Sequence, residues 1–480
     1  MIDVCELFKN DYIGKEVLLG GWIRNHRKQK EFGFIDFNDG TCFQNLQIVY
    51  DNSLKNFDDI QKLHIGSAIT VRGTIIKSEG NGQAIEMKLM EYTLCGDCPE
   101  DYPIQPKRHT REFLREQAYL RTRTNLFGAV FRVRSVAAYA IHKYFQDKGY
   151  VYFHAPIITA SDCEGAGEMF QVTTLDMDRI AKSGEVDYSK DFFGKKAALT
   201  VSGQLQAETF AMSYKKVYTF GPTFRAENSN TKTHASEFWM IEPEIAFCDL
   251  EGDMDIMEDM LKYVVKYVLD NCPNEMSFFD KFVEKGLLDK LHKLINSKFT
   301  RIDHEEVISI LKKAPVKWEF APEYGEDIAR EHEKYITEYF NGPVFIKNWP
   351  KDIKAFYMKQ NDDGKTGWLY CIQPEGYDPM IALHDDDVYE EIIRGEFPEI
   401  DYEADSFGDV SLNIGSGKEE FFEFFYRNKN SGAANLIHYA YDLCICPTHI
   451  EADILALGKG HYSDEIEVPI LDDEKTWLNR

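Results

Sequence analysis

The stretch from Val217 to Phe247 constrains the fold most, because its residue pattern predicts two strands joined by a polar loop. Apolar side chains and Gly dominate residues 217–224, and the connecting run ENSNTKTHASE is rich in loop-forming residues. The second half alternates with the period of two that a sheet with distinct faces requires. One face would carry Trp239, Ile241, Pro243, Ile245 and Phe247, and the other Met240, Glu242, Glu244 and Ala246.

Two charged residues, Arg225 and Glu227, fall where the first predicted strand meets the loop. A planar guanidinium can hold a phosphate and a carboxylate bidentately, and a carboxylate two residues further on can accept hydrogen bonds from an amine. These groups suit a nucleoside triphosphate that reacts with an acid. An Arg–Glu pair on a surface hairpin would look the same from these two residues alone, and such pairs are common.

The residues that follow favour the chemical interpretation. FRAE, His234 and Phe238 together resemble the second signature motif of class II aminoacyl-tRNA synthetases, and the run GPTFRAENSNTKTHASEFWMIEPE is similar to the asparaginyl members of the aspartyl/asparaginyl/lysyl subgroup. The resemblance implies that Arg225 binds the α-phosphate and the amino-acid carboxylate. It also implies that Glu227 reads the adenine end, that His234 reaches the γ-phosphate, and that Phe238 stacks on adenine.

A Gly-containing loop, SDCEGAGEM, precedes this motif and can close over a ligand. In the subgroup such a loop folds over the amino acid. The resemblance therefore makes Glu168 a candidate to hold the substrate ammonium, whereas a surface acid is the plain alternative.

The run SGQLQAE, which begins a predicted helix, discriminates between substrates. Aspartate-specific relatives carry SPQLYKQ here, with a Lys that neutralises the substrate side chain. Ala207 replaces that Lys, and Glu208 supplies an acceptor. A carboxylate attracts an amide NH2 and repels a substrate carboxylate, so asparagine is favoured over aspartate. By the same resemblance Gln204 contacts the substrate α-amino group.

Residues 1–98 contain five short strand-like runs separated by Gly, Asn and Asp. Five such runs suit a small closed barrel, and the OB-fold is the five-stranded barrel that binds oligonucleotides. The basic run IRNHRKQKEFGF fits phosphate and base contacts, although a charged hairpin on any barrel is an equal alternative. The order GWIRNHR, FIDF, LQIV resembles the anticodon-binding domain of the same subgroup. It implies tRNA anticodon contacts from Arg24, Arg27, Phe34 and Gln47.

Residues 99–125 carry early prolines and later a basic cluster, which predicts a hinge. From Leu126 the apolar period becomes 3.6, which predicts a helix ending near Gly149, followed by a strand and Pro156. A long helix, a strand and a Pro resemble the first class II motif, which implies a homodimer interface that includes Pro156. An ordinary core helix would show the same period.

The charge of the chain is unevenly distributed. The formal net charge is −26, yet residues 367–480 account for −18 of it and leave −8 for residues 1–366. The acidity therefore does not argue against a nucleic-acid partner for the N-terminal part. Ten scattered cysteines favour reduced thiols over a disulfide framework, and a zinc knuckle at Cys95 and Cys98 lacks a properly spaced second half. With no predicted signal peptide or membrane span, we expect a cytoplasmic protein and no membrane partner.

The resemblance ends near Thr366. An intact member continues with an acidic pair for magnesium, an arginine that holds the substrate, and a Gly-rich third motif with a further arginine, none of which is recognisable in residues 367–480. That region can be a divergent replacement, a domain joined to a truncated synthetase, or part of an inactive paralogue. Because several donors to the transition state would be lost together, the sequence predicts adenylate formation that is weak or absent, and retained tRNA binding.

The sequence therefore predicts an α+β protein with four regions. These are an OB-fold barrel at 1–98, a hinge at 99–125, a class II domain with an antiparallel sheet flanked by helices at 126–366, and an acidic region of unknown fold at 367–480. The predicted function is ATP- and Mg2+-dependent ligation of asparagine to tRNA(Asn) by a homodimer. The alternative is a catalytically impaired paralogue that binds tRNA or an amino acid as a regulator.

Overall fold

The computed structural model describes residues 1–480 apart from 81, 164–168, 227–234, 355–358 and 364–480. The described residues divide into two compact units, 1–141 with 260–297 and 142–259 with the described residues from 298 on. Two of the three boundaries fall inside long helices, α4 (Asn125–Asp147) and α7 (Leu250–Asn271). None of the helices in the described ranges is both long and apolar enough to cross a membrane.

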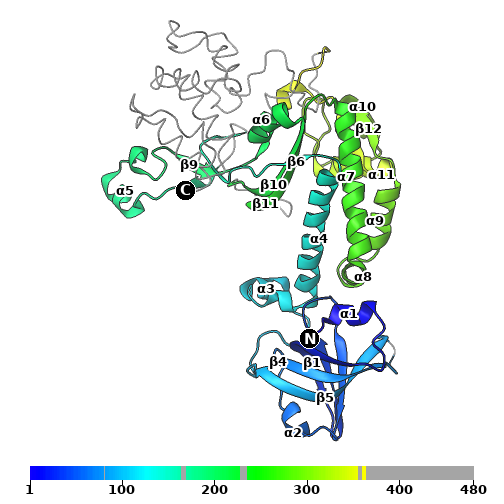
Figure 1. The fold of residues 1–480 in the computed structure, drawn as a ribbon. Coiled ribbons are helices and arrows are strands. Elements are labelled where there is room, and N and C mark those ends of the chain that lie inside the picture. Colours follow the sequence, from blue (N-terminus) through cyan, green and yellow to red (C-terminus); the bar gives the residue numbers. More distant parts are fainter. Residues whose placement is uncertain (81, 164–168, 227–234, 355–358, 364–480) are drawn as a thin grey trace, which may run out of the picture. The chain divides into compact units, whose positions relative to one another are not determined.

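The first unit contains the predicted barrel. Five strands, β1 (Glu16–Lys28), β2 (Phe32–Asn38), β3 (Leu46–Asp51), β4 (Ala68–Lys77) and β5 (Ile85–Gly96), close in the order β1-β2-β3-β5-β4 (Figure 1). Alternate residues such as Leu19, Ile35, Ile48 and Val71 fill the interior because successive side chains of a strand point to opposite faces. Helices α1 (Val4–Lys9) and α2 (Phe57–Ile60) accompany the barrel. The five-strand prediction is confirmed, with β1 and β5 longer than expected.

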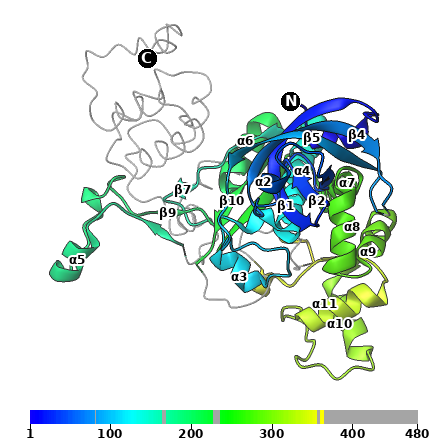
Figure 2. The same cartoon turned by 90° about the horizontal axis from the view of Figure 1, so that it is seen from below.

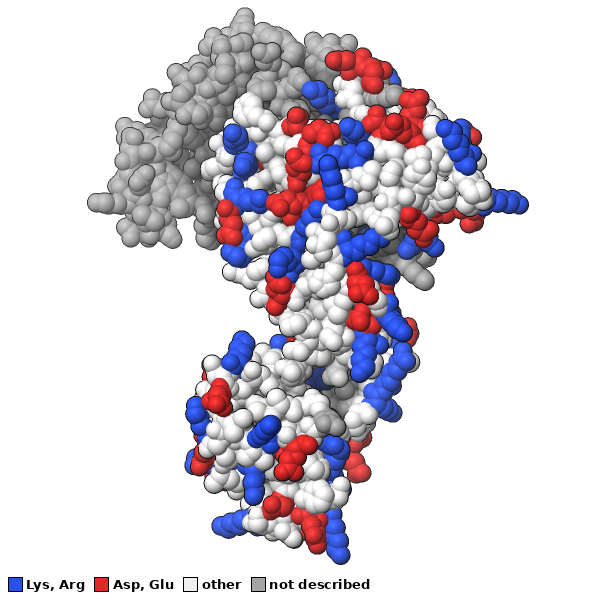
Figure 3. All heavy atoms as spheres, turned by 90° about the vertical axis from the view of Figure 1, so that its right-hand side faces the viewer, with Lys and Arg blue, Asp and Glu red and all other residues white. Residues whose placement is uncertain are grey.

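The predicted hinge forms local structure of its own. Helix α3 (Arg111–Glu116) and the 3-10 turn η1 (Arg121–Arg123) lie in it, and Tyr102, Leu114 and Leu120 pack with Cys98 in a small apolar cluster. In the same unit α8 (Pro273–Phe282) and α9 (Leu287–Asn296) share a second apolar cluster with residues 133–137 of α4. On the face shown in Figure 3, Lys and Arg side chains are interspersed with acids.

The second unit contains the strands that the opening motif predicts. Strands β10 (Lys216–Phe224) and β11 (Glu237–Ile245) pair antiparallel, as expected, and β6 (Val151–Tyr152) adds to β10 in parallel. Pro243 is tolerated because β11 lies at the edge of this sheet among the described strands, where a missing N–H breaks no ladder. Helix α6 (Gln204–Tyr214) packs against β10 and β11 through Ala207, Ala211 and Val217 (Figure 1).

A small sheet of β7 (Ile158–Thr159), β9 (Ala197–Leu199) and β8 (Gln171–Val172) leads into α6. Between β8 and β9 the chain forms α5 (Met177–Ser183) and the turn η2 (Tyr188–Lys190). In both Figure 1 and Figure 2 the α5 segment extends away from the β10–β11 pair.

One strand interrupts the series of helices that follows α7. Strand β12 (Thr300–Asp303) lies between α9 and α10 (His304–Lys313) and pairs in parallel with β13 (Val344–Lys347). Its four residues are too few to show a period, and its partner is distant in sequence. Helix α11 (Arg330–Tyr339) and the turn η3 (Lys351–Ile353) complete the described part.

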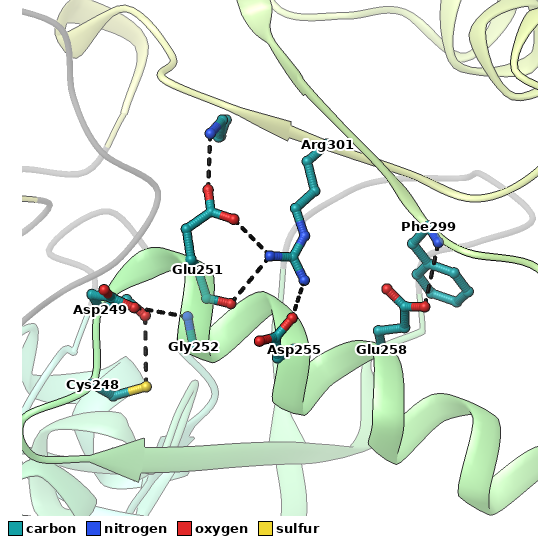
Figure 4. A network of polar contacts seen from close by, with 9 residues as sticks. Cys248, Asp249, Glu251, Gly252, Asp255, Glu258, Phe299 and Arg301 are labelled. Carbon is teal, nitrogen blue, oxygen red and sulfur yellow. Dashed lines mark hydrogen bonds and ion pairs between the residues drawn. The ribbon is translucent and has the colours of Figure 1, made fainter.

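A network of ion pairs fixes this strand pair to the start of α7. Arg301 of β12 bonds Glu251 at 2.6 Å and also contacts Asp255, while Lys347 of β13 bonds the other oxygen of Glu251 at 2.9 Å (Figure 4). A connected network of this kind holds its parts more firmly than isolated surface pairs do.

Candidate functional site

Arg225 lies at the end of β10, where the sequence predicts it. Its backbone N–H donates to the carbonyl oxygen of Ser236 at 3.1 Å, so the two chains are still paired as they leave the sheet. The guanidinium Nη2 donates to the carbonyl oxygen of buried Val201 at 3.3 Å, and its carbon lies 5.7 Å from the centroid of the Phe238 ring. The structure thus brings together two of the four predicted ATP-site residues.

A glycine turn faces the same strand pair. The carboxylate of Glu242 on β11 accepts the N–H of Gly203 at 3.2 and 3.1 Å through its two oxygens, and it also accepts the hydroxyl of Ser202. A Cβ at Gly203 would lie 2.8 Å from that of Ala155 and 3.0 Å from Thr219 Cγ2, so a side chain has no room. This turn is the N-terminal boundary of α6, where a carboxylate is also favourable to the helix dipole.

Gln204 and Glu208 occupy successive turns of α6. Gln204 Nε2 donates to Glu208 Oε1 at 2.9 Å, so the structure joins the two predicted amino-acid-binding residues. Glu208 is 1% exposed, whereas Gln204 is half-buried. Gln204 is therefore the more accessible of the two side chains.

The polar interior next to α6 is strongly acidic. Burial, together with the carboxylates of Glu208, Glu242 and Asp253, raises the pKa of Glu244 well above its usual range. Burial also raises the pKa of Asp253 to about 6. Crowding of carboxylates away from water disfavours their charged forms. The arrangement disfavours a further negative charge.

Glu168, Glu227 and His234 lie outside the described residues. The region after residue 363, whose sequence contains no recognisable third motif, also lies outside them. In the described ranges, no group of three or more His, Cys, Asp or Glu side chains is arranged to hold a metal ion. Cys95 and Cys98 are free thiols.

The barrel brings together three of the four predicted anticodon contacts. Arg27 of β1 lies opposite Phe34 of β2 in the strand register, with its guanidinium 5.0 Å from the ring centroid. Arg27 Nη2 donates to Gln47 Oε1 at 2.7 Å, and Gln47 Nε2 donates to buried Glu86 at 2.9 Å. Phe32 packs edge-on against Phe34 at 5.5 Å. An exposed cation, stacking faces and an oriented amide therefore share one barrel face.

Arg24, the fourth predicted contact, has a different setting. It donates to the carbonyl oxygen of Arg123 at 2.6 Å, and burial lowers its pKa. Its guanidinium lies in a cleft of about 1320 Å³ between the barrel and residues 102–126, within the first unit. Pro156, the predicted dimer-interface residue, is half-buried in the single chain.

Two residues of the site were not predicted from the sequence. Glu242 appears there only as one of several alternating residues, and Ser202 only as a letter of SGQLQAE. The alternation of β11 places Glu242 on the face opposite Trp239 and Ile241, which is a usable signal. The sequence does not show that α6 begins against that face.

Comparison with known proteins gives two family matches. Residues 110–435 match the family described as tRNA synthetases class II (D, K and N). Residues 17–94 match the OB-fold nucleic acid binding domain. The first match covers more than half of the chain and extends past Thr366.

Similar proteins include the asparagine–tRNA ligase of Acholeplasma laidlawii, which is 62% identical over 359 residues, or 74% of this chain and 78% of that protein. The asparagine–tRNA ligase of Clostridium beijerinckii is 54% identical over 368 residues, or 76% of this chain and 79% of that protein. Among solved structures, asparaginyl-tRNA synthetase from Pyrococcus horikoshii complexed with asparaginyl-adenylate matches with a TM-score of 0.62 at 27% identity. It covers 74% of this chain and 76% of that one.

Proposed function

The chain belongs to the class II tRNA synthetases of the D, K and N group, and from that premise we propose that it is an asparagine–tRNA ligase. The observation that carries the assignment is 62% identity, over about three quarters of both chains, to a protein of that name. The predicted fold supports it, because the OB-fold barrel and the class II strand pair are both present.

The proposed reaction has two steps. A carboxylate oxygen of asparagine attacks the α-phosphorus of ATP, which forms asparaginyl-adenylate and releases pyrophosphate. A hydroxyl of the terminal ribose of tRNA(Asn) then attacks the acyl carbon and releases AMP. Neither step needs a general base from the protein, so positioning and charge stabilisation carry the catalysis.

Arg225 is proposed to hold the carboxylate of asparagine against the α-phosphate. Its position supports this role, because the hydrogen bond to Val201 and the Phe238 ring hold the guanidinium at the end of the β10–β11 pair that leads into the loop. Phe238 would stack on adenine, and Gln204 would meet the α-amino group. Glu168, Glu227 and His234 remain proposals that rest on the family resemblance.

The acidic cluster supports selection for a neutral side chain. Glu208 and its neighbours Glu242, Glu244 and Asp253 disfavour a second carboxylate, as the raised pKa of Glu244 indicates. Aspartate would bring such a charge, and asparagine would not. We propose Glu208 as the acceptor of the substrate amide.

We propose ATP with Mg2+ as the cosubstrate. The described residues provide no metal site, so no step is assigned to the ion. A homodimer that includes Pro156, anticodon contacts from Arg24, Arg27, Phe34 and Gln47, and a cytoplasmic location follow from the family and belong to the same proposal. The four-region division of the chain stands on the same basis.

The test is ATP–pyrophosphate exchange on the purified chain, with asparagine, with aspartate and without amino acid. We expect exchange that requires asparagine and disappears in Arg225→Ala, at a rate below that of the Acholeplasma laidlawii relative. The lower rate is expected because the sequence shows no third motif after Thr366. Exchange that is absent, or that proceeds equally with aspartate, would overturn the assignment.

A further inference from the structure

An exposed aromatic pair lies outside the site described above. Phe192 and Phe193 follow η2 and pack edge to face with ring centroids 4.9 Å apart. Phe192 is 76% exposed and Phe193 is 43% exposed. Adjacent exposed aromatic rings on a soluble domain are informative, since they commonly mark a binding surface.

The loop that carries these rings is firmly held. The buried carboxylate of Asp191 accepts the hydroxyl of Thr173 at 2.6 Å, and accepts both the N–H and the hydroxyl of Thr174 at 2.8 Å. These hydrogen bonds lower the pKa of Asp191 below its usual range. Gly194, at φ +65°, then turns the chain back. The hydrogen bonds of Asp191 and the turn at Gly194 therefore hold the two rings in their exposed positions.

The charges beside the rings favour one kind of partner. Lys195 and Lys196 are exposed and directly follow the turn. Aromatic faces next to lysines are the combination that binds single-stranded nucleic acid, because the rings stack on bases and the ammonium groups meet phosphates. We call residues 191–196 the aromatic tip.

The aromatic tip is also continuous with the active-site turn. Lys196 is followed at once by β9, whose end leads through Thr200 to Ser202 and Gly203. Thr200 in turn accepts the N–H of Phe224, the residue before Arg225, at 2.9 Å. Only β9 and two further residues therefore separate the aromatic tip from Ser202 in the sequence.

We propose that the aromatic tip binds the unpaired 3′ end of tRNA through its Phe192 and Phe193 rings. The inference rests on the proposed function, which requires that end of the tRNA to enter the site. Phe192, the more exposed ring, is the principal stacking face, and the lysines contact the adjoining phosphates.

The experiment measures equilibrium binding of two tRNA(Asn) molecules, one intact and one lacking its unpaired 3′ nucleotides. The protein is the full chain, its Phe192→Ala/Phe193→Ala variant, and the single Phe192→Ala variant, which removes a ring with little packing and so keeps the fold. We expect the double variant to bind intact tRNA about tenfold or more weakly than the wild type, equivalent to about 1.4 kcal/mol. Truncated tRNA should bind all three proteins equally.

Phe320→Ala is the matched control, since Phe320 is a 60%-exposed Phe elsewhere in the same unit, and it should leave both affinities unchanged. Phe192→Tyr/Phe193→Tyr should retain affinity because the rings remain. Equal binding of intact tRNA by wild type and both Ala variants would overturn the proposal. So would an equal loss for both tRNA molecules, or a loss of self-association with tRNA affinity unchanged, which would assign the tip to a second copy.

Binding at equilibrium needs no catalysis, so the two proposals can fail separately. If the chain catalyses asparagine-dependent exchange but the tip variants bind tRNA as the wild type does, only the proposal for the aromatic tip is refuted. Absence of exchange refutes the ligase, while the binding comparison still decides whether the tip recognises the tRNA end.

Discussion

Replacing Glu208 by Gln tests whether this carboxylate selects asparagine. The two side chains have nearly the same shape, and the amide oxygen of a Gln at 208 can still accept the hydrogen bond that Gln204 Nε2 donates at 2.9 Å. The change also removes a negative charge that contributes to the raised pKa of Glu244. Helix α6 should therefore remain in place, and the free energy of unfolding should stay the same or rise.

The expected effect on asparagine follows from the lost charge. A hydrogen bond to a charged group contributes about 1.5–3 kcal/mol, so Glu208→Gln should weaken asparagine binding by roughly 10- to 150-fold. The assay is the asparagine dependence of ATP–pyrophosphate exchange, supported by calorimetric titration with asparagine. Aspartate should gain relative to asparagine, because one repelling carboxylate is gone.

Glu275→Gln is the control, since Glu275 is a buried acid of the other compact unit and should leave the asparagine dependence unchanged. A folded Glu208→Gln protein whose asparagine dependence matches wild type within twofold would refute substrate contact by Glu208. The residue would then act only through its bond to Gln204.

Three further changes test the barrel, the glycine turn and the acidic cluster. Phe34→Ala should weaken tRNA binding by about 1–3 kcal/mol in a binding titration and leave asparagine-dependent exchange unchanged; the reverse pattern would remove the barrel from anticodon binding. Gly203→Ala should lower the free energy of unfolding by about 1–3 kcal/mol in denaturant titration, because the added Cβ meets Ala155 at 2.8 Å and Thr219 at 3.0 Å; an unchanged midpoint would contradict this packing. Asp253 has a folded pKa of about 6, above its unfolded value near 3.8, so its proton stabilises the fold at low pH and that stability is lost as pH rises through 6. Asp253→Asn should therefore flatten the decrease in stability between pH 4 and 7, and an unaltered slope would refute the assignment.

The local parts of the fold were predictable from the sequence because their signals are short in range. Alternation predicted β11, the period of 3.6 predicted α4, and Gly- and Asn-rich breaks separated the five barrel strands. The register of the barrel follows from which face is apolar. Arg27, Phe34 and Gln47 were named from the family resemblance, and only the structure places them on one face.

The parts that escaped prediction depend on partners distant in the sequence. Strand β12 pairs with β13, which begins more than forty residues later, and no pattern in Thr300–Asp303 names that partner. Asp191 likewise looks like any acid of a polar insertion, although the structure surrounds it with Thr173 and Thr174. A local period carries no information on such contacts.

Glu242 shows how these distant contacts determine the site itself. The motif supplies Arg225 and Phe238, but a carboxylate on the opposite strand fixes the turn from which Gln204 and Glu208 extend. The same carboxylate belongs to the cluster that raises the pKa of Glu244. Discrimination against a charged side chain is therefore a property of the cluster's combined field, and this is why a change at Glu208 alone is expected to shift the preference for asparagine without abolishing it.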